Sequence, residues 1–402
     1  MKKATFSLDF AFFEYLRTFY IENRGRSRSR YRDLTKKYLD FNDPDENRGA
    51  FLREPQFEAL EMYVFLKEYL DNRHVHQIFE DWHKRRNSFE RRSNIGTTQL
   101  GLFGNLEVEQ YQAFFEYIKS VGVQHYPSYI FALAMGTGKT ILMATCIFYE
   151  FLLANKWPKD TKYCHNALVF APDKTVLQSL REIETFEMEQ VVPPEYVNRL
   201  RSNLTFHFLD ESGMALSTLD DSQFNIIISN TQKIILKRQH KEQSATDKLF
   251  KSGKLTYQAG TPYEQFSDLY EDELAENETE LTVNQRFQKL TRLRQLGIYV
   301  DEAHHAFGST LERDMGVKKT KTSLRLTIDE LAKNLERAGT HVVGCYNFTG
   351  TPYVGNRVLP EVVYSYGLRE AIDKGFLKKV TLHTYTNPKS SEFVRFVIEA
   401  FL

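Results

Sequence analysis

The pattern of apolar and polar positions changes near Pro127. Upstream, apolar residues recur at helical spacing, which predicts a mainly helical section. Downstream, short apolar runs alternate with helical stretches, a pattern typical of a parallel sheet covered by helices. The predicted strands span residues 129–133, 167–171, 204–209, 225–229, 297–300 and 341–348. The predicted helices of this part span residues 140–154, 174–189 and 326–338. The fold class is therefore α/β, with a mostly parallel sheet covered by helices.

The upstream section contains three predicted helices. The first opens at residues 51–60 with Pro55 in its first turn, and the others span 75–92 and 107–121. A basic run precedes them, in which every second residue is an arginine: Arg24, Arg26, Arg28, Arg30 and Arg32. Such a run either binds nucleic-acid phosphates or forms a solvated linker, and the sequence leaves both interpretations open.

These patterns predict three regions. Residues 1–125 form the helical section, residues 126–385 form the sheet domain, and residues 386–402 begin a further region. A polar insertion at about residues 241–296 interrupts the sheet domain. Its centre is strongly acidic, which predicts a surface excursion.

Composition narrows the class of protein. The 402 residues suffice for two or three domains, and 42% hydrophobic with 26% charged residues is typical of a soluble globular protein. The formal net charge of +0 means that nucleic-acid binding must come from local patches. The three cysteines lie far apart, which favours a reducing cytosol over disulfides or structural zinc. No apolar run approaches the ~20 residues that span a bilayer, so we expect a cytoplasmic protein without membrane contact.

A phosphate-binding loop is predicted where the first strand meets its helix. The loop is Gly136-Thr137-Gly138-Lys139-Thr140, and its glycines let the backbone approach an anion closely. Free amide groups at the start of the helix favour that anion. Lys139 is placed to bind the β- and γ-phosphates of a nucleotide, and Thr140 to bind Mg²⁺.

Two carboxylates follow the strand at 297–300. Asp301 and Glu302 lie at its carboxyl end, where open α/β sheets bind their ligands. Asp301 is placed to hold Mg²⁺, directly or through water. Glu302 is placed to orient or deprotonate the attacking water.

These motifs together resemble a known family. Lys139-Thr140, Asp301-Glu-Ala-His304 and Thr349-Gly-Thr-Pro352 look like motifs I, II and III of superfamily 2 DEAD/DEAH-box helicases. Within that superfamily the chain resembles the restriction subunits of type III and type I restriction enzymes. The resemblance implies a RecA-like P-loop ATPase domain that uses ATP and Mg²⁺.

The resemblance also implies contacts with DNA. Residues 167–175 are similar to motif Ia, and residues 228–232 to a later strand-contacting motif. The implied DNA-binding residues are Pro172, Lys174, Asn230 and Thr231. The residues implied to couple the nucleotide to the DNA are His304, Thr349 and Thr351.

Two glutamines compete to read the adenine. Gln56, in Leu52-Arg-Glu-Pro-Gln56, resembles the helicase Q-motif, in which a glutamine contacts the edge of the base. Gln112 lies closer to the loop in the sequence. We favour Gln56.

The chain departs from the family pattern in two respects. Leu133 stands where these proteins usually have Ala or Gly. In addition, no motif with an arginine finger follows Pro352, so we expect a second RecA-like domain to act in cis or in trans. A methyltransferase or specificity subunit is a further expected partner.

The predicted function is an ATP-dependent DNA helicase or translocase motor domain in restriction or phage defence. The isolated chain is expected to turn over ATP weakly. The alternative is a nucleotide-binding interaction or sensor module with little turnover of its own.

Overall fold

The computed structural model describes residues 11–84, 86–89, 125–171, 180–209, 224–230, 237–238, 281–282, 289–303, 324–350, 353–354, 357–358 and 361–377. The chain divides into two compact units, Met1–Tyr366 and Gly367–Leu402. In the second unit the described part contains helix α16 (Leu368–Asp373). None of the helices described is both long enough and apolar enough to cross a membrane.

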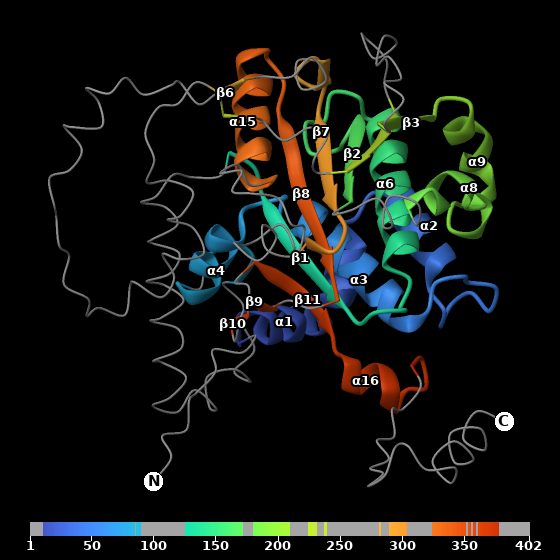
Figure 1. Ribbon diagram of the computed structural model, residues 1–402. Helices are drawn as coiled ribbons and strands as arrows, with labels where there is room; N and C mark the ends of the chain where they lie inside the picture. The colour runs from blue at the N-terminus through green and yellow to red at the C-terminus, as the bar shows by residue number, and fades with distance from the viewer. Residues whose placement is uncertain are drawn as a thin grey trace, which may run out of the picture. The chain divides into compact units, whose positions relative to one another are not determined.

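A seven-stranded parallel sheet forms the centre of the first unit (Figure 1). Its strand order is β11-β1-β8-β7-β2-β4-β3, and every neighbouring pair is parallel. The strands are β1 (Ser128–Leu133), β2 (Asn166–Ala171), β3 (Thr205–Leu209), β4 (Asn225–Asn230), β7 (Leu296–Val300), β8 (Val342–Thr349) and β11 (Val362–Tyr366). Two short antiparallel pairs are β5 (Lys237–Arg238) with β6 (Leu281–Thr282), and β9 (Tyr353–Val354) with β10 (Arg357–Val358). Because the strands are parallel, the residues that follow β1, β7 and β8 meet at one edge of the sheet.

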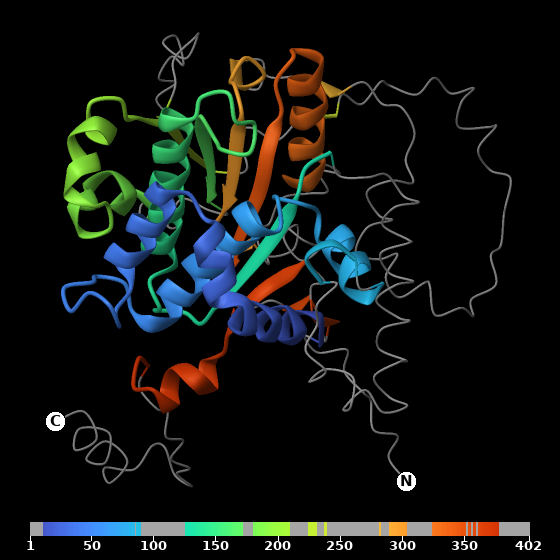
Figure 2. The same cartoon turned by 180° about the vertical axis from the view of Figure 1, so that it is seen from behind.

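Helices cover both faces of this sheet (Figures 1 and 2). The α-helices are α1 (Ala11–Arg30), α2 (Asp33–Asn42), α3 (Glu54–Val64), α4 (Val75–His83), α6 (Lys139–Lys156), α8 (Glu182–Thr185), α9 (Pro194–Arg201) and α15 (Leu324–Arg337). A π-helix, η1 (Phe65–Tyr69), continues α3, and the 3₁₀ turns are η2 (Asn87–Phe89) and η4 (Met188–Gln190). Buried parallel sheets require this double cover, since both faces are apolar.

Successive side chains of a strand point to opposite faces of the sheet, so neighbouring residues of β7 contact different helices. Ile298 and Val300 of β7 lie in one buried cluster with Leu331 and Leu335 of α15. Tyr299, between them, points to the opposite face. There it lies against Tyr63 of α3, with 3.2 Å between the two hydroxyl oxygens.

The predicted strands agree with the structure to within one or two residues at each end. Helices α6 and α15 confirm two of the three helices predicted for this part. The third, 174–189, is wrong as one continuous helix, because α8 ends at Phe186 in an extended conformation (φ −66°, ψ 128°). Phe186 leaves the helix and packs its ring on Phe51, with ring centroids 5.5 Å apart.

Other predictions for the upstream section meet mixed outcomes. The helix predicted at 75–92 ends as α4 at His83, and Asn87 has a left-handed φ of 53°. The helix at 107–121 lies outside the described residues, as does most of the polar insertion. Strand β11 and helix α9 were not predicted.

The basic run is not a linker. Arg24 to Arg30 form the end of α1 and Arg32 precedes α2; within α1, Arg24 and Arg28 lie one turn apart and share two buried carboxylates. Glu61 Oε1 lies 3.0 Å from Arg24 Nε and 2.8 Å from an Arg28 nitrogen, and Asp43 Oδ2 lies 2.9 Å from Arg28. These arginines therefore hold α1 to the rest of the helical layer. Phosphate binding by the two exposed arginines of the run, Arg26 and Arg30, stays a prediction.

Candidate nucleotide-binding site

The loop between β1 and α6 has the geometry of an anion cradle. Gly136 and Gly138 have φ values of 76° and 82°, in the left-handed region that a Cβ disfavours. Thr137 closes the turn, since its Oγ1 donates to the carbonyl of Ala134 at 2.7 Å. Leu133 is the last residue of β1, so the turn forms after it and does not need a glycine there.

Helix α6 begins at Lys139, directly after the second glycine. The first amide groups of a helix have no partner within it, and the helix dipole adds partial positive charge at this end. Thr140 is the second residue of α6 and is partly exposed. The loop and helix together therefore favour a phosphate group.

The two carboxylates leave β7 beside this loop. Asp301 is 6% exposed, and its backbone N–H donates to Phe170 O of β2 at 3.0 Å. Its Oδ1 accepts a hydrogen bond from the backbone N–H of Glu302 at 2.9 Å. Glu302 has a φ of 46°, which is strained for a residue with a side chain and indicates that the surroundings impose this conformation.

Glu302 joins the ends of three strands. One carboxylate oxygen, Oε1, lies 3.1 Å from Lys139 Nζ of α6. The other, Oε2, accepts a long hydrogen bond from the backbone N–H of Gly350, at 3.5 Å, just beyond β8. A Cβ on Gly350 would lie 3.0 Å from Met135 Cγ and 3.5 Å from Lys139 Nζ. A side chain at this position would press on Met135, so a glycine suits the close approach to the loop.

Gln56 of α3 contacts the loop from the helical layer. Its Nε2 donates to the carbonyl of Gly138 at 3.1 Å, and its Oε1 accepts from the backbone N–H of Arg53 at 3.0 Å. A Cβ on Gly138 would lie 2.5 Å from Nε2. The amide is 4% exposed, and each of its polar atoms keeps one further hydrogen or lone pair.

Comparison with known families agrees with this geometry. The family described as "Type III restriction enzyme, res subunit" matches residues 104–329, more than half of the chain. The chain belongs to this family. A search of curated proteins finds no match. The res-subunit family has the RecA-like P-loop fold of a helicase-like, ATP-dependent motor domain, which confirms the predicted fold class and resemblance.

The residues present suit Mg²⁺ as well as a phosphate chain. Among the described residues, no group of three or more His, Cys, Asp or Glu side chains gathers to hold a metal ion. Mg²⁺ does not require such a group, because it commonly takes one or two carboxylates together with phosphate oxygens and water. The Asp301 carboxylate and the Thr140 hydroxyl are oxygen donors of the kind that Mg²⁺ takes, so these two residues would hold the ion.

Several residues predicted from the sequence lie outside the described parts of the chain. They are Gln112, Pro172, Lys174, Thr231, His304 and Thr351. Asn230 is the last residue of β4, and Thr349 ends β8 as a fully buried residue. The sequence reasoning missed Gly350 as a contact of Glu302. Its position between two threonines at a strand end was the available signal.

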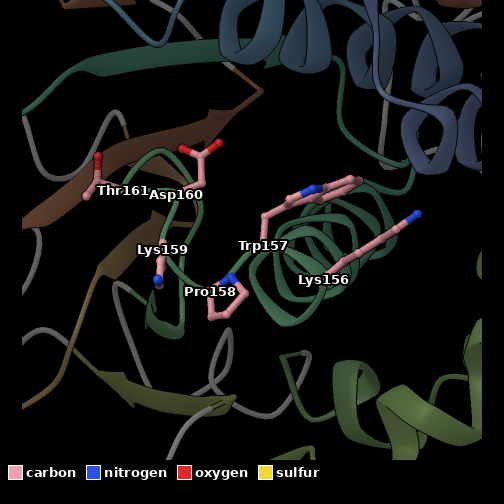
Figure 3. Close-up of a pocket in the computed structure, with 6 residues that line it drawn as sticks. All are labelled: Lys156, Trp157, Pro158, Lys159, Asp160 and Thr161. Carbon is pink, nitrogen blue, oxygen red and sulfur yellow. The ribbon is translucent and has the colours of Figure 1, made fainter.

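A hollow away from this site lies at the carboxyl end of α6. Figure 3 shows its lining by the last residue of α6 and the loop that follows: Lys156, Trp157, Pro158, Lys159, Asp160 and Thr161. Its volume is about 620 Å³. The Arg32 guanidinium covers the Trp157 ring at 4.3 Å and pairs with Asp160. This hollow lies at the opposite end of α6 from Lys139.

Proposed function

We propose that this chain binds Mg·ATP and hydrolyses it as the motor domain of a DNA translocase or helicase in a restriction or phage-defence system. The observation that carries the proposal is the meeting of Lys139, Glu302 and Gly350. Residues of the helicase-like motifs I, II and III meet at one carboxylate: Glu302 Oε1 lies 3.1 Å from Lys139 Nζ, and Oε2 lies 3.5 Å from the backbone nitrogen of Gly350. A lysine on the phosphates and a group that orients the attacking water both have a part in phosphoryl transfer to water, and Lys139 and Glu302 suit these two parts.

The roles follow from position and chemistry. Lys139 and the loop amides bind the phosphates, while Thr140 and Asp301 hold Mg²⁺, which neutralises charge on the phosphate oxygens. Glu302 orients and deprotonates the attacking water. Because Lys139 pairs with Glu302, a phosphate that attracts Lys139 also frees this carboxylate for the water. Gly350 lies on the same carboxylate, so the residues that follow β8 are placed to respond to that change.

Gln56 is the proposed reader of adenine. It lies on the loop already, and its remaining hydrogen and lone pair match the acceptor and donor on the edge of adenine. If it reads the base, Gln56→Ala will reduce the preference for ATP over GTP. If it only holds the loop, both affinities will fall equally. Gln77→Ala is the matched control, because Gln77 caps α4 as Gln56 caps α3.

DNA is the proposed track. Pro172, Lys174, Asn230 and Thr231 would contact its backbone without reading sequence, so binding should weaken steeply with salt. His304, Thr349 and Thr351 would relay the nucleotide state to this face. A second RecA-like domain, in cis or in trans, would supply the arginine that completes hydrolysis. A methyltransferase or specificity subunit and a cytoplasmic location complete the proposal.

Calorimetric titration tests the nucleotide site directly. Wild-type chain should bind Mg·ATP, and Lys139→Ala should lose that binding. Lys156→Ala, an exposed lysine at the other end of the same helix, should bind like wild type. Equal affinities for wild type and Lys139→Ala would refute the assignment.

Turnover separates the motor from the sensor alternative. Glu302→Gln should keep Mg·ATP binding and lose hydrolysis. Hydrolysis by wild type should be weak alone and rise when a second RecA-like domain is supplied. An arginine finger is typically worth ~10³ to 10⁵ in rate. A chain that binds ATP but shows no gain with any added domain would favour the sensor.

A further inference from the structure

A segment of the helical section lies directly beneath the strands that carry the nucleotide site. It comprises residues 63–73, which include the end of α3, the π-helix η1 and the turn before α4. We call it the clamp segment. A π-helix is uncommon and often marks a functional position. Lys67, in this π-helix, is 1% exposed.

Three tyrosines form a row across the sheet above the clamp segment. Tyr129 of β1 pairs in register with Tyr346 of β8, which pairs with Tyr299 of β7. Residues paired in register on neighbouring strands point to the same face. The rings of Tyr299 and Tyr346 lie 5.0 Å apart, centroid to centroid.

Two glycines make room for this row. Gly297 and Gly344 are themselves paired, two positions before the tyrosines of their strands. A Cβ on Gly297 would lie 3.0 Å from a ring carbon of Tyr299, and one on Gly344 would lie 2.9 Å from the Tyr346 hydroxyl. The tyrosine rings therefore lean back over the glycines, toward the amino ends of the strands.

The clamp segment contacts each tyrosine hydroxyl. Tyr129 donates to the carbonyl of Arg73 at 2.6 Å. Lys67 Nζ donates to the Tyr346 hydroxyl at 2.6 Å. The Tyr299 hydroxyl lies 3.2 Å from that of Tyr63. The one segment thus holds β1, β8 and β7.

The same segment is tied to the helix of the phosphate loop. Glu150 of α6 is fully buried, and its Oε1 accepts from Lys67 Nζ at 2.8 Å and from the Tyr63 hydroxyl at 2.6 Å. Its Oε2 accepts from the backbone N–H of Cys164 at 2.9 Å. Burial raises the pKa of Tyr63 well above its usual value, so the hydroxyl stays protonated and able to donate.

The three strands and the helix that the clamp segment contacts each have one end at the proposed nucleotide site. Strand β1 leads into the loop, β7 into Asp301, and β8 into Gly350, while α6 starts at Lys139. A buried polar group that loses its partner costs free energy, so the network resists any sliding of one element past another. Sliding of α6 against β7 would separate Lys139 from Glu302, whose Nζ and Oε1 atoms lie 3.1 Å apart, and would move Thr140 relative to Asp301.

We propose that the clamp segment positions the two halves of the Mg²⁺ site, Thr140 on α6 and Asp301 after β7, through the hydroxyls of Tyr299 and Tyr346. These tyrosines are positioning residues and touch no nucleotide. The inference rests on the proposed nucleotide-binding function. It predicts that the clamp segment affects the gain in ATP affinity that Mg²⁺ provides, because this gain requires α6 and β7 together.

The test compares ATP affinity with Mg²⁺ and with EDTA. Binding without the metal uses the loop alone, whereas the gain from Mg²⁺ needs both halves of the site. Tyr299→Phe and Tyr346→Phe each remove one hydroxyl. Both should leave the affinity in EDTA unchanged and reduce the Mg²⁺ gain about tenfold, since small displacements are costly in a preorganised site.

Tyr126→Phe is the matched control. Tyr126 is 1% exposed, and its hydroxyl donates to a carboxylate outside the clamp segment, Asp329 of α15, at 2.6 Å. Its loss should lower the urea midpoint of unfolding about as much and leave the Mg²⁺ gain intact. A full gain in Tyr299→Phe and Tyr346→Phe, or an equal loss in Tyr126→Phe, would overturn the clamp alone. No ATP binding by wild type under either condition would overturn the proposed function.

Discussion

Replacement of Lys67 by methionine is the most direct test of the buried network. Lys67 is 1% exposed and Glu150 is fully buried, so water cannot compensate either group. Methionine has a similar length and no charge. The variant leaves the Glu150 carboxylate with two neutral donors, the Tyr63 hydroxyl and the Cys164 backbone N–H.

The expected cost is large. Removing one partner of a buried ion pair typically costs 3–5 kcal/mol, at about 1.4 kcal/mol for each factor of ten. Lys67→Met should therefore raise the unfolding equilibrium constant by about 140-fold to 3,700-fold. A surface pair is worth about 0–1 kcal/mol. Lys162→Met, which breaks the exposed pair with Asp71 at 3.0 Å, should lie within that smaller range.

Urea unfolding followed by far-ultraviolet circular dichroism measures both variants on the same chain. Comparison of midpoints is valid while the slope of the transition stays constant. The larger loss of stability in Lys67→Met comes from the Glu150 carboxylate, which remains buried without its ammonium partner. Removing this carboxylate as well should restore part of the stability. Lys67→Met/Glu150→Met should therefore lie closer to wild type than Lys67→Met alone.

Two results would refute this reasoning. A loss below about 1 kcal/mol for Lys67→Met would show that the pair behaves like a surface pair. The second result is a double variant whose loss of stability equals the sum of the losses in Lys67→Met and Glu150→Met measured singly. That result would show that the two side chains act independently.

Two further predictions concern other buried positions. Gly297→Ala should destabilise the fold by about 1–3 kcal/mol, because the added Cβ would lie 2.5 Å from Cys164 Sγ. The double variant Gly297→Ala/Cys164→Ala should recover part of the lost urea midpoint. A double variant that recovers nothing would show that the strain does not come from Cys164. His165 is 3% exposed, neither of its ring nitrogens has a hydrogen-bond partner among the residues that the structure describes, and burial lowers its pKa, with Arg294 and His341 adding to the effect. Since the unfolded chain takes up the proton first, stability should fall as pH drops below about 6.5, and His165→Leu should reduce that dependence in urea midpoints between pH 7.5 and 5.5.

The central strands were predictable because buried parallel strands are continuously apolar. The positions of the loop at Gly136 and of the carboxylate at Asp301, at the ends of β1 and β7, were predictable because both follow such runs directly. Strand β11 is equally apolar, yet no motif follows it that would single it out. The family match then confirms the fold class.

The helical section was harder to predict because its partners are distant. Arg24 and Arg28 share a helical face, but their carboxylates, Asp43 and Glu61, are 15 to 37 residues away in the sequence. A sequence shows the charges of such a run without showing which are paired. The contact between Gln56 and Gly138 spans 82 residues and was beyond the same kind of reasoning.

These distant contacts change how the helical section is understood. The predicted boundary at residue 125 follows a change in hydrophobic pattern. Contacts nevertheless cross it: Gln56 donates to the phosphate loop, and Lys67 pairs with the Glu150 carboxylate of α6, the helix that follows this loop. A fragment that began after residue 125 would bury Glu150 without its ammonium partner and leave the Tyr346 hydroxyl without a donor. The proposed nucleotide site therefore depends on both sections, although all of the residues proposed to bind phosphate and Mg²⁺ come from the second.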